Sequence, residues 1–219
     1  MDVTKINEIE EAVENIRLWI NSASRSCRRV LHAVVNNAGI GNGQLVDWME
    51  SLSANSQKEM DVNFFGLVNT IKEHLPILKS QKLSGVYKNS RIINVVSMAG
   101  LVGGFPGMSM YHASKFAAEA FTMSLRTELA PFGIYVVSVN PSFHKTPLVD
   151  YMPSGLDKLW KGLSPELKEE YGKGTKAFFL DFVFFLVTSR TIFRTPCFLF
   201  ALKIILMFYE VMFYSNHII

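Results

Sequence analysis

The 219-residue chain has few cysteines and only a small excess of positive charge. Cys27 and Cys197 are too few for a disulfide scaffold, and neither belongs to a C-x-x-C pair or to a His/Cys cluster typical of zinc sites. Lys and Arg number 22 against 19 Asp and Glu, and no basic run exceeds two residues, which argues against nucleic-acid binding. The first residues contain no apolar segment typical of a secretory signal. We therefore expect an intracellular protein with reduced thiols and no metal site.

Hydrophobic residues are distributed unevenly along the chain. Residues 177–219 hold 12 of the 24 Phe and Tyr residues (17 Phe and 7 Tyr). The charged residues in this segment are Asp181, Arg190, Arg194, Lys203 and Glu210. The apolar run at 196–213 is near the lower length limit for crossing a bilayer, but it contains two of these charges. We predict one domain at 1–176 and a hydrophobic tail at 177–219, which either associates with a membrane or is a translated non-coding stretch.

Helical and extended segments alternate along the predicted domain. Apolar residues recur at helical spacing in 5–20, 56–79 and 110–130. Short β-rich runs, which predict strands, occupy 30–35, 91–96 and 134–139. Because the strands are almost uniformly apolar, they are typical of a parallel sheet covered on both faces. The predicted fold class is α/β, with a doubly wound parallel sheet.

Each predicted strand is followed by polar residues or glycine. These strand ends are 36–39, 97–100 and 140–146. Ligands of open parallel sheets bind beyond the carboxyl ends of the strands. The sequence therefore predicts a ligand site formed by these three segments.

Tyr111 and Lys115 are the strongest candidates for chemistry in the sequence. They lie four residues apart in a predicted helix, so their side chains share one face. A neighbouring ammonium favours the phenolate, and we therefore expect the pKa of Tyr111 to lie below its usual value. Such a phenol can exchange a proton with a substrate near neutral pH, and Ser97 could hydrogen-bond the substrate oxygen. Taken alone, the same spacing also fits an exposed helix pair with no catalytic role.

Other motifs accompany this pair in a fixed order. They are Asn-Asn-Ala-Gly (36–39), Asn63 in Asp-Val-Asn-Phe-Phe-Gly, Ser97 in Asn-Val-Val-Ser-Met-Ala-Gly, Tyr-His-Ala-Ser-Lys (111–115), and Asn140-Pro141 with Thr146. Together they resemble the short-chain dehydrogenase/reductase family over residues 1–176. The segments 63–66, 143–147 and 164–172 are most similar to its retinol, hydroxysteroid and β-hydroxybutyrate dehydrogenase branch.

The resemblance implies a role for each catalytic candidate. Tyr111 would be the general acid/base, and Lys115 would lower its pKa and bind the nicotinamide ribose hydroxyls. Ser97 would orient the substrate oxygen, and Asn63 would hold a water against Lys115 in a proton relay. The implied reaction is reversible hydride transfer between NAD or NADP, with NAD favoured, and a lipophilic alcohol or ketone such as a retinol, steroid or hydroxy acid.

The resemblance also implies a set of cofactor-binding residues. Asp2 would contact adenine, and Thr146 would reach the nicotinamide amide or the phosphate. The others, besides Lys115, are Asn36, Ala38, Gly39 and Pro141.

One element of the family pattern does not occur in this sequence. No Gly-x-x-x-Gly-x-Gly turn precedes residue 39, although such a turn normally presents a helix N-terminus to the pyrophosphate. We therefore expect a Rossmann-type sheet that lacks its first strands, and a 219-residue chain that binds neither cofactor measurably by itself. The alternative to an enzyme is an inactive variant that either pairs with other subunits through 56–79 and 110–130 or is tethered by 177–219 to endoplasmic reticulum or mitochondrial membranes.

Overall fold

The computed structural model describes residues 1–24, 28–41, 54–87, 89–103, 107–142, 157–158 and 160–172. The chain divides into two compact units, Met1–Ser142 and Phe143–Ile219. The tail predicted at 177–219 lies outside the described residues. No helix within the described ranges combines the length and the apolar character needed to cross a membrane.

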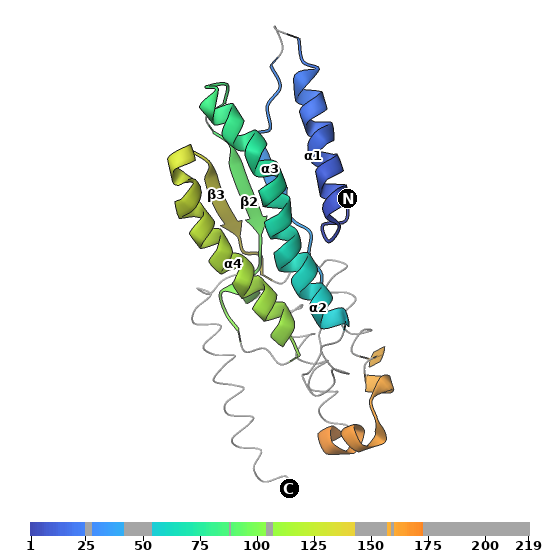
Figure 1. The fold of residues 1–219 in the computed structure, drawn as a ribbon. Coiled ribbons are helices and arrows are strands. Elements are labelled where there is room, and N and C mark those ends of the chain that lie inside the picture. Colours follow the sequence, from blue (N-terminus) through green and yellow to red (C-terminus); the bar gives the residue numbers. More distant parts are fainter. Residues whose placement is uncertain are drawn as a thin grey trace. The chain divides into compact units, whose positions relative to one another are not determined.

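The first unit is an α/β structure built on a parallel three-stranded sheet (Figure 1). Its strands are β1 (Ala33–Asn36), β2 (Arg91–Val95) and β3 (Tyr135–Val139), in that spatial order. Its longer helical segments are α1 (Ile6–Asn21), α2 (Ala54–Met60), the π-helical turn η2 (Asp61–Phe65), α3 (Gly66–Leu83) and α4 (Ser109–Leu129). Two short 3-10 turns, η3 (Met98–Gly100) and η4 (Ala130–Phe132), follow β2 and α4. This arrangement confirms the predicted α/β class with a partial parallel sheet.

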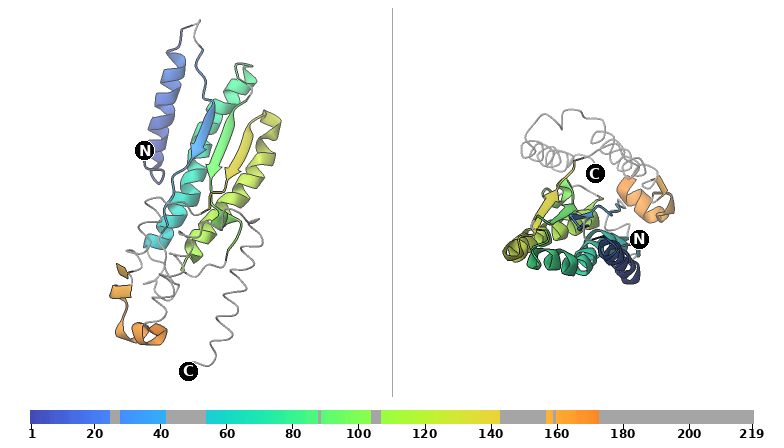
Figure 2. Two further views of the ribbon diagram at one scale, coloured as in Figure 1. Left: turned by 180° about the vertical axis from the view of Figure 1, so that it is seen from behind. Right: turned by 90° about the horizontal axis from the view of Figure 1, so that it is seen from above.

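Helices α1, α3 and α4 lie on one side of the sheet (Figure 2). In the register of the strands Val34 lies beside Ile92, and Ile92 beside Val136, and all three side chains are buried beneath the helices. The helices contribute buried residues to the same core, namely Leu67, Ile71 and Leu78 from α3 and Ala118, Leu125 and Leu129 from α4. Burial of these side chains stabilises the pairing of helices and sheet.

The opposite face of the sheet remains accessible. Val35 and Tyr135 are each 57% exposed, and Val137 and Val139 are each 43% exposed. Because successive strand residues point to opposite faces, these side chains alternate with the buried ones. The expectation of helices on both faces is therefore met on only one face within the described residues.

The first strand begins later than its apolar run predicts. Pairing with β2 starts at Ala33, while the backbone of Leu31 is bonded to the side chain of Gln81. Leu31 N donates to Gln81 Oε1 over 2.7 Å, and Gln81 Nε2 donates to Leu31 O over 3.0 Å. A helix side chain thus supplies the hydrogen bonds that a neighbouring strand would otherwise provide.

The helix predicted at 56–79 is longer and less regular than expected. A π-helical turn separates α2 from α3, and α3 continues seven residues beyond Pro76 to Leu83. The proline removes one backbone hydrogen bond. The next residues of the helix, Ile77 and Leu78, have buried side chains, and this packing stabilises the helix beyond the proline.

Candidate active site

The ends of β2 and β3 are joined side by side by hydrogen bonds. Ser97 N donates to Asn140 Oδ1 over 3.2 Å, and Met98 N donates to Pro141 O over 3.0 Å. These bonds extend the parallel pairing past the last strand residues. They place Ser97 and Pro141 next to each other at the edge where the sequence predicts a ligand.

Asn63 connects the end of β1 to helix α4. Its side chain is 2% exposed and lies in the π-helical turn. Asn63 Oδ1 accepts from Ile40 N over 2.8 Å, and Nδ2 donates to Ile40 O and to Ser114 Oγ over 2.9 and 3.0 Å. Both amide hydrogens are therefore used, and only acceptor capacity remains for the relay water that the resemblance implies.

Tyr111, Ser97 and Lys115 come together at this edge. The Ser97 hydroxyl lies close enough to the Tyr111 phenol to lower its pKa. Lys115 Nζ lies 5.7 Å from the centroid of the Tyr111 ring. The Ser97 hydroxyl also accepts from Ala99 N over 3.1 Å, which fixes its position at the start of η3. Two residues on one helix face and one strand-end residue thus form a single cluster.

The structure reverses the expected direction of the Tyr111 pKa. Burial of the phenol raises its pKa most strongly, and the negative charge of Glu59 raises it further, while the Ser97 hydrogen bond lowers it. The expected lowering by Lys115 was wrong for this structure, because desolvation of the phenolate outweighs the favourable contacts. At neutral pH the phenol is therefore protonated and able to donate to a substrate oxygen.

Lys115, on helix α4, is buried, and its ammonium lies beside the loop that follows β1. The residue is 5% exposed, and burial lowers the pKa of its ammonium to about 8. A Cβ atom placed on Gly39 would lie 3.4 Å from Lys115 Nζ and 3.5 Å from Asn63 Oδ1. The ammonium and the amide oxygen therefore border the same glycine.

Gly100 allows the turn that carries Ser97 to pack tightly against α4. A Cβ atom at this position would approach the backbone oxygen of Lys115 to 2.7 Å, which is too close for a side chain. The glycine thus permits direct contact between η3 and the helix. This contact holds Ser97 near Tyr111.

The Asn36 side chain lies in the core beneath the helices. Its Nδ2 donates to Asn94 Oδ1 over 2.8 Å, and Asn94 Nδ2 donates to Thr122 Oγ1 over 2.8 Å. The network links β1, β2 and α4, and Asn94 is fully buried. The amide of Asn36 therefore stabilises the strand ends, and the cofactor contacts of Asn36, Ala38 and Gly39 stay predictions.

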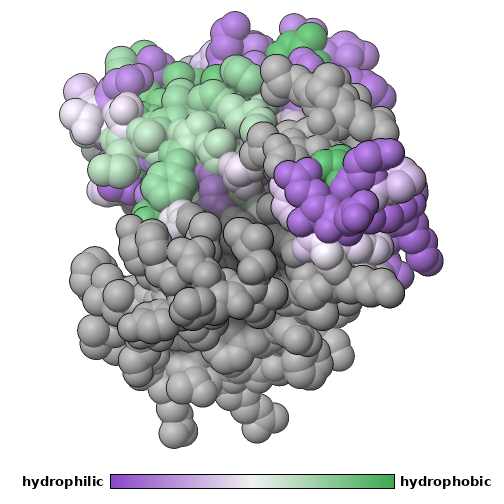
Figure 3. All heavy atoms as spheres, turned by 90° about the horizontal axis from the view of Figure 1, so that it is seen from below, coloured by the Kyte–Doolittle hydropathy of each residue, from purple (hydrophilic) through white to green (hydrophobic). Residues whose placement is uncertain are grey.

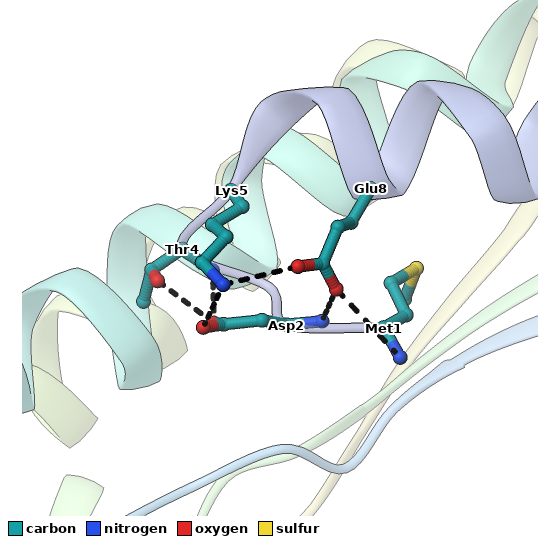
Figure 4. A network of polar contacts seen from close by, with 5 residues as sticks. All are labelled: Met1, Asp2, Thr4, Lys5 and Glu8. Carbon is teal, nitrogen blue, oxygen red and sulfur yellow. Dashed lines mark hydrogen bonds and ion pairs between the residues drawn. The ribbon is translucent and has the colours of Figure 1, made fainter.

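Asp2 belongs to a polar network at the start of α1 (Figure 4). Its carboxylate accepts from Thr4 N over 3.0 Å and from Thr4 Oγ1 over 2.8 Å. These hydrogen bonds lower the pKa of the Asp2 carboxyl, so the residue is ionised at neutral pH. Its backbone N–H donates to Glu8 Oε2 over 2.7 Å. The predicted adenine contact would have to coexist with this network, and the predicted contact of Thr146 lies outside the described residues.

Sequence reasoning missed three buried polar residues around this cluster. They are Glu59 on α2 and Ser114 and Glu119 on α4. Ser114 Oγ accepts from Asn63 and donates to the backbone oxygen of Tyr111 over 2.8 Å. The position of Glu59, four residues before Asn63, was a signal that it shares a helix face with that residue.

Apolar side chains border the site. Figure 3 views the end of the molecule toward which the strands run, and the described atoms there include a continuous green area. Near the cluster, Leu101 is 53% exposed and Phe116 is 42% exposed. A Cβ atom on Gly103 would lie 3.5 Å from the Phe116 ring, so the ring packs beside the loop that follows η3.

A parallel sheet with Ser, Tyr and Lys side chains gathered at its carboxyl edge is an α/β fold of the Rossmann type with a candidate active site. The chain belongs to the short-chain dehydrogenase family, whose family model matches residues 1–156.

Its relatives include several dehydrogenases. It is 34% identical over 178 residues to bovine (Bos taurus) dehydrogenase/reductase SDR family member 9, covering 79% of this chain and 50% of the relative. It is 32% identical to mitochondrial D-beta-hydroxybutyrate dehydrogenase and to retinol dehydrogenase 16, both from Rattus norvegicus. These matches cover 79% and 82% of this chain and 48% and 52% of the relatives. The chain thus spans about half the length of the curated relatives it matches.

Solved structures show the same relationship. A short-chain dehydrogenase from Burkholderia cenocepacia, in complex with NADP, superposes with a TM-score of 0.55 at 30% identity, over 68% of this chain and 55% of that chain. A 3-ketoacyl-(acyl-carrier-protein) reductase from Brucella melitensis, complexed with NADH, superposes with a TM-score of 0.59 at 27% identity, over 74% and 62%.

Proposed function

We propose that this chain carries the proton-transfer site of a nicotinamide-dependent dehydrogenase or reductase that acts on a lipophilic alcohol or ketone. The observation that carries the proposal is the Ser97–Tyr111–Lys115 cluster at the carboxyl edge of the sheet. The exposed Leu101 and Phe116 beside this cluster favour an apolar substrate. The relative named retinol dehydrogenase 16 supports a lipophilic alcohol, and the relative named D-beta-hydroxybutyrate dehydrogenase supports a hydroxy acid.

Among the described residues, Lys115 suits the ribose part of such a cofactor. Lys115 is buried, and this burial lowers the pKa of its ammonium to about 8. Ribose hydroxyls would give this ammonium hydrogen-bond acceptors. The cofactor supplies the hydride acceptor or donor, and we favour NAD over NADP.

The three side chains divide the proton chemistry between them. In alcohol oxidation the Tyr111 phenol would first lose its proton to solvent, and the resulting phenolate would take the hydroxyl proton as the carbon gives its hydride to the oxidised nicotinamide. In ketone reduction the Tyr111 phenol returns that proton to the carbonyl oxygen. Ser97 orients the reacting oxygen and lowers the pKa of the phenol, and Lys115 binds the ribose of the cofactor.

The test compares two preparations of the protein. One is the 219-residue chain, and the other is the same chain joined to a Gly-rich strand–turn–helix segment of the family type. We expect the joined protein to oxidise a retinol, a steroid alcohol or a β-hydroxy acid with NAD in preference to NADP. We expect the 219-residue chain to bind neither measurably, because a diphosphate needs several charge-assisted hydrogen bonds, each worth about 1.5–3 kcal/mol. A joined protein that binds the cofactor but oxidises none of these alcohols would contradict the proposal.

A second candidate function is pairing with another copy of the chain through its helices. The observation favouring it is that α4 and the neighbouring η2 expose large apolar side chains. Phe116 and Met123, seven residues apart on one face, are 42% and 58% exposed, and Phe65 in η2 is 50% exposed. Apolar side chains at this spacing suit packing against a second helix.

Replacing both Phe116 and Met123 by serine should convert a dimer to a monomer. The change removes the apolar contact area that would stabilise helix pairing. Sedimentation equilibrium measures the mass, and Leu18→Ser, which removes an exposed apolar side chain from α1, is the matched control. An unaltered protein that is monomeric, or a double variant that remains dimeric, would exclude this interface.

A further inference from the structure

Glu119 is a buried carboxylate that joins α4 to the end of β3. The residue is 8% exposed. Its Oε1 accepts from Ser138 Oγ over 2.9 Å, and its Oε2 accepts from Asn140 Nδ2 over 3.3 Å. The two carboxylate oxygens thus bind one residue of β3 and the residue that directly follows this strand.

The bond from Asn140 determines which way its amide points. Nδ2 must face Glu119, because the amide oxygen would meet a carboxylate if the group were turned over. Asn140 Oδ1 is consequently directed to Ser97 N, from which it accepts over 3.2 Å. A chain of two hydrogen bonds therefore runs from Glu119 to the backbone of Ser97.

We propose that Glu119 is a positioning residue, which acts through Asn140 to hold the Ser97 hydroxyl against the Tyr111 phenol. It touches neither the phenol nor Lys115 in the hydrogen bonds of the described residues, so it acts only through the strand end. The role assigned to Ser97 rests on the proposed function. The geometry of the chain from Glu119 to Ser97 is independent of catalysis.

The experiment follows the ionisation of Tyr111 in the unliganded protein. Fluorotyrosine is incorporated, since its ring fluorine lowers the phenol pKa and gives a magnetic resonance signal, and Tyr111→Phe identifies the signal of Tyr111. The Ser97 hydrogen bond lowers the pKa of this phenol. Glu119→Leu and Asn140→Ala should each raise the midpoint by about one pH unit, because the phenolate loses a hydrogen bond.

Two further variants separate positioning from charge and from general destabilisation. Glu119→Gln keeps an acceptor for Asn140 and should leave the midpoint unchanged or slightly lower. Loss of the negative charge alone would lower the midpoint, so a rise in Glu119→Leu cannot come from the charge. Thr122→Val, one turn further along α4, breaks a buried hydrogen bond with Asn94 that is not connected to Ser97, and it should leave the midpoint unchanged.

The combined Glu119→Leu and Asn140→Ala variant should show no larger rise than either change alone, because both interrupt the same chain of bonds. An unchanged midpoint in Glu119→Leu, or in Asn140→Ala if the first variant does not fold, would overturn the proposal. The titration uses no cofactor and no substrate. A failed dehydrogenase assay would therefore count against the proposed function and leave this result standing.

Discussion

Replacing Tyr111 by phenylalanine should reduce hydride transfer at least about 100-fold in the form of the protein that binds the nicotinamide cofactor. The phenol is the only group in the Ser97–Tyr111–Lys115 cluster to which we assign the transferred proton. Phenylalanine retains the ring and its packing on α4 but removes the hydroxyl. Single-turnover measurement of nicotinamide absorbance reports hydride transfer without interference from product release.

A control variant and a binding measurement accompany this test. Tyr135→Phe changes a tyrosine that is 57% exposed on the open face of the sheet, and it should leave the rate unaltered. Cofactor affinity should be nearly the same in Tyr111→Phe, because the ribose contact is assigned to Lys115. An unchanged rate in Tyr111→Phe would show that another group carries the proton.

Replacing Lys115 by methionine should make the unliganded protein more stable at neutral pH, by about 3 kcal/mol. The pKa of Lys115 is about 8 in the folded protein, against the ordinary value of 10.5. Burying the ammonium therefore costs free energy when the lysine is charged. Methionine fills a similar volume, has a similar helix propensity and carries no charge.

The same linkage predicts a pH dependence with a definite sign. Between pH 8 and 10.5 the unfolded chain binds more protons at Lys115 than the folded chain does, so stability rises with pH in this window. Below pH 8 the full cost of the buried charge is present, and above pH 10.5 it is absent. The advantage of Lys115→Met should accordingly be largest below pH 8 and disappear by about pH 10.5.

Urea unfolding at a series of pH values measures this difference. Lys72→Met, at an exposed position on α3, is the matched control and should give a small effect. A Lys115→Met protein that is less stable than the unaltered chain at pH 7 would mean that the ammonium is compensated by its surroundings. Its burial could then not be used as support for a ribose contact.

Local patterns in the sequence were sufficient for the class of fold and for the pairing of Tyr111 with Lys115. The strands were identified from short β-rich runs and the helices from apolar spacing, because both patterns depend on neighbours within a few residues. The spacing of four residues in a helix brings two side chains to one face in almost any fold. The polar ends of the strands followed from the rule that parallel strands finish at the same edge.

The predicted bounds and regularity of the elements were wrong where a side chain far away in the sequence bonds the backbone. Gln81 binds the backbone of Leu31, and β1 starts at Ala33, three residues later than predicted. Asn63 bonds Ile40, 23 residues away, from within a π-helical turn that the apolar spacing did not reveal. Both contacts join residues that are far apart in the sequence, so patterns among neighbouring residues cannot predict them.

The amino-acid sequence by itself determined that an α/β chain would present Ser97, Tyr111 and Lys115 near one edge of a parallel sheet. Only the tertiary structure decided that burial and the charge of Glu59 raise the pKa of Tyr111, against the expectation from its neighbour in the helix. It also decided that Glu119 reaches Ser97 through Asn140. The physical reason is that desolvation and hydrogen bonding depend on distances between residues far apart in the chain, which packing sets and local spacing does not.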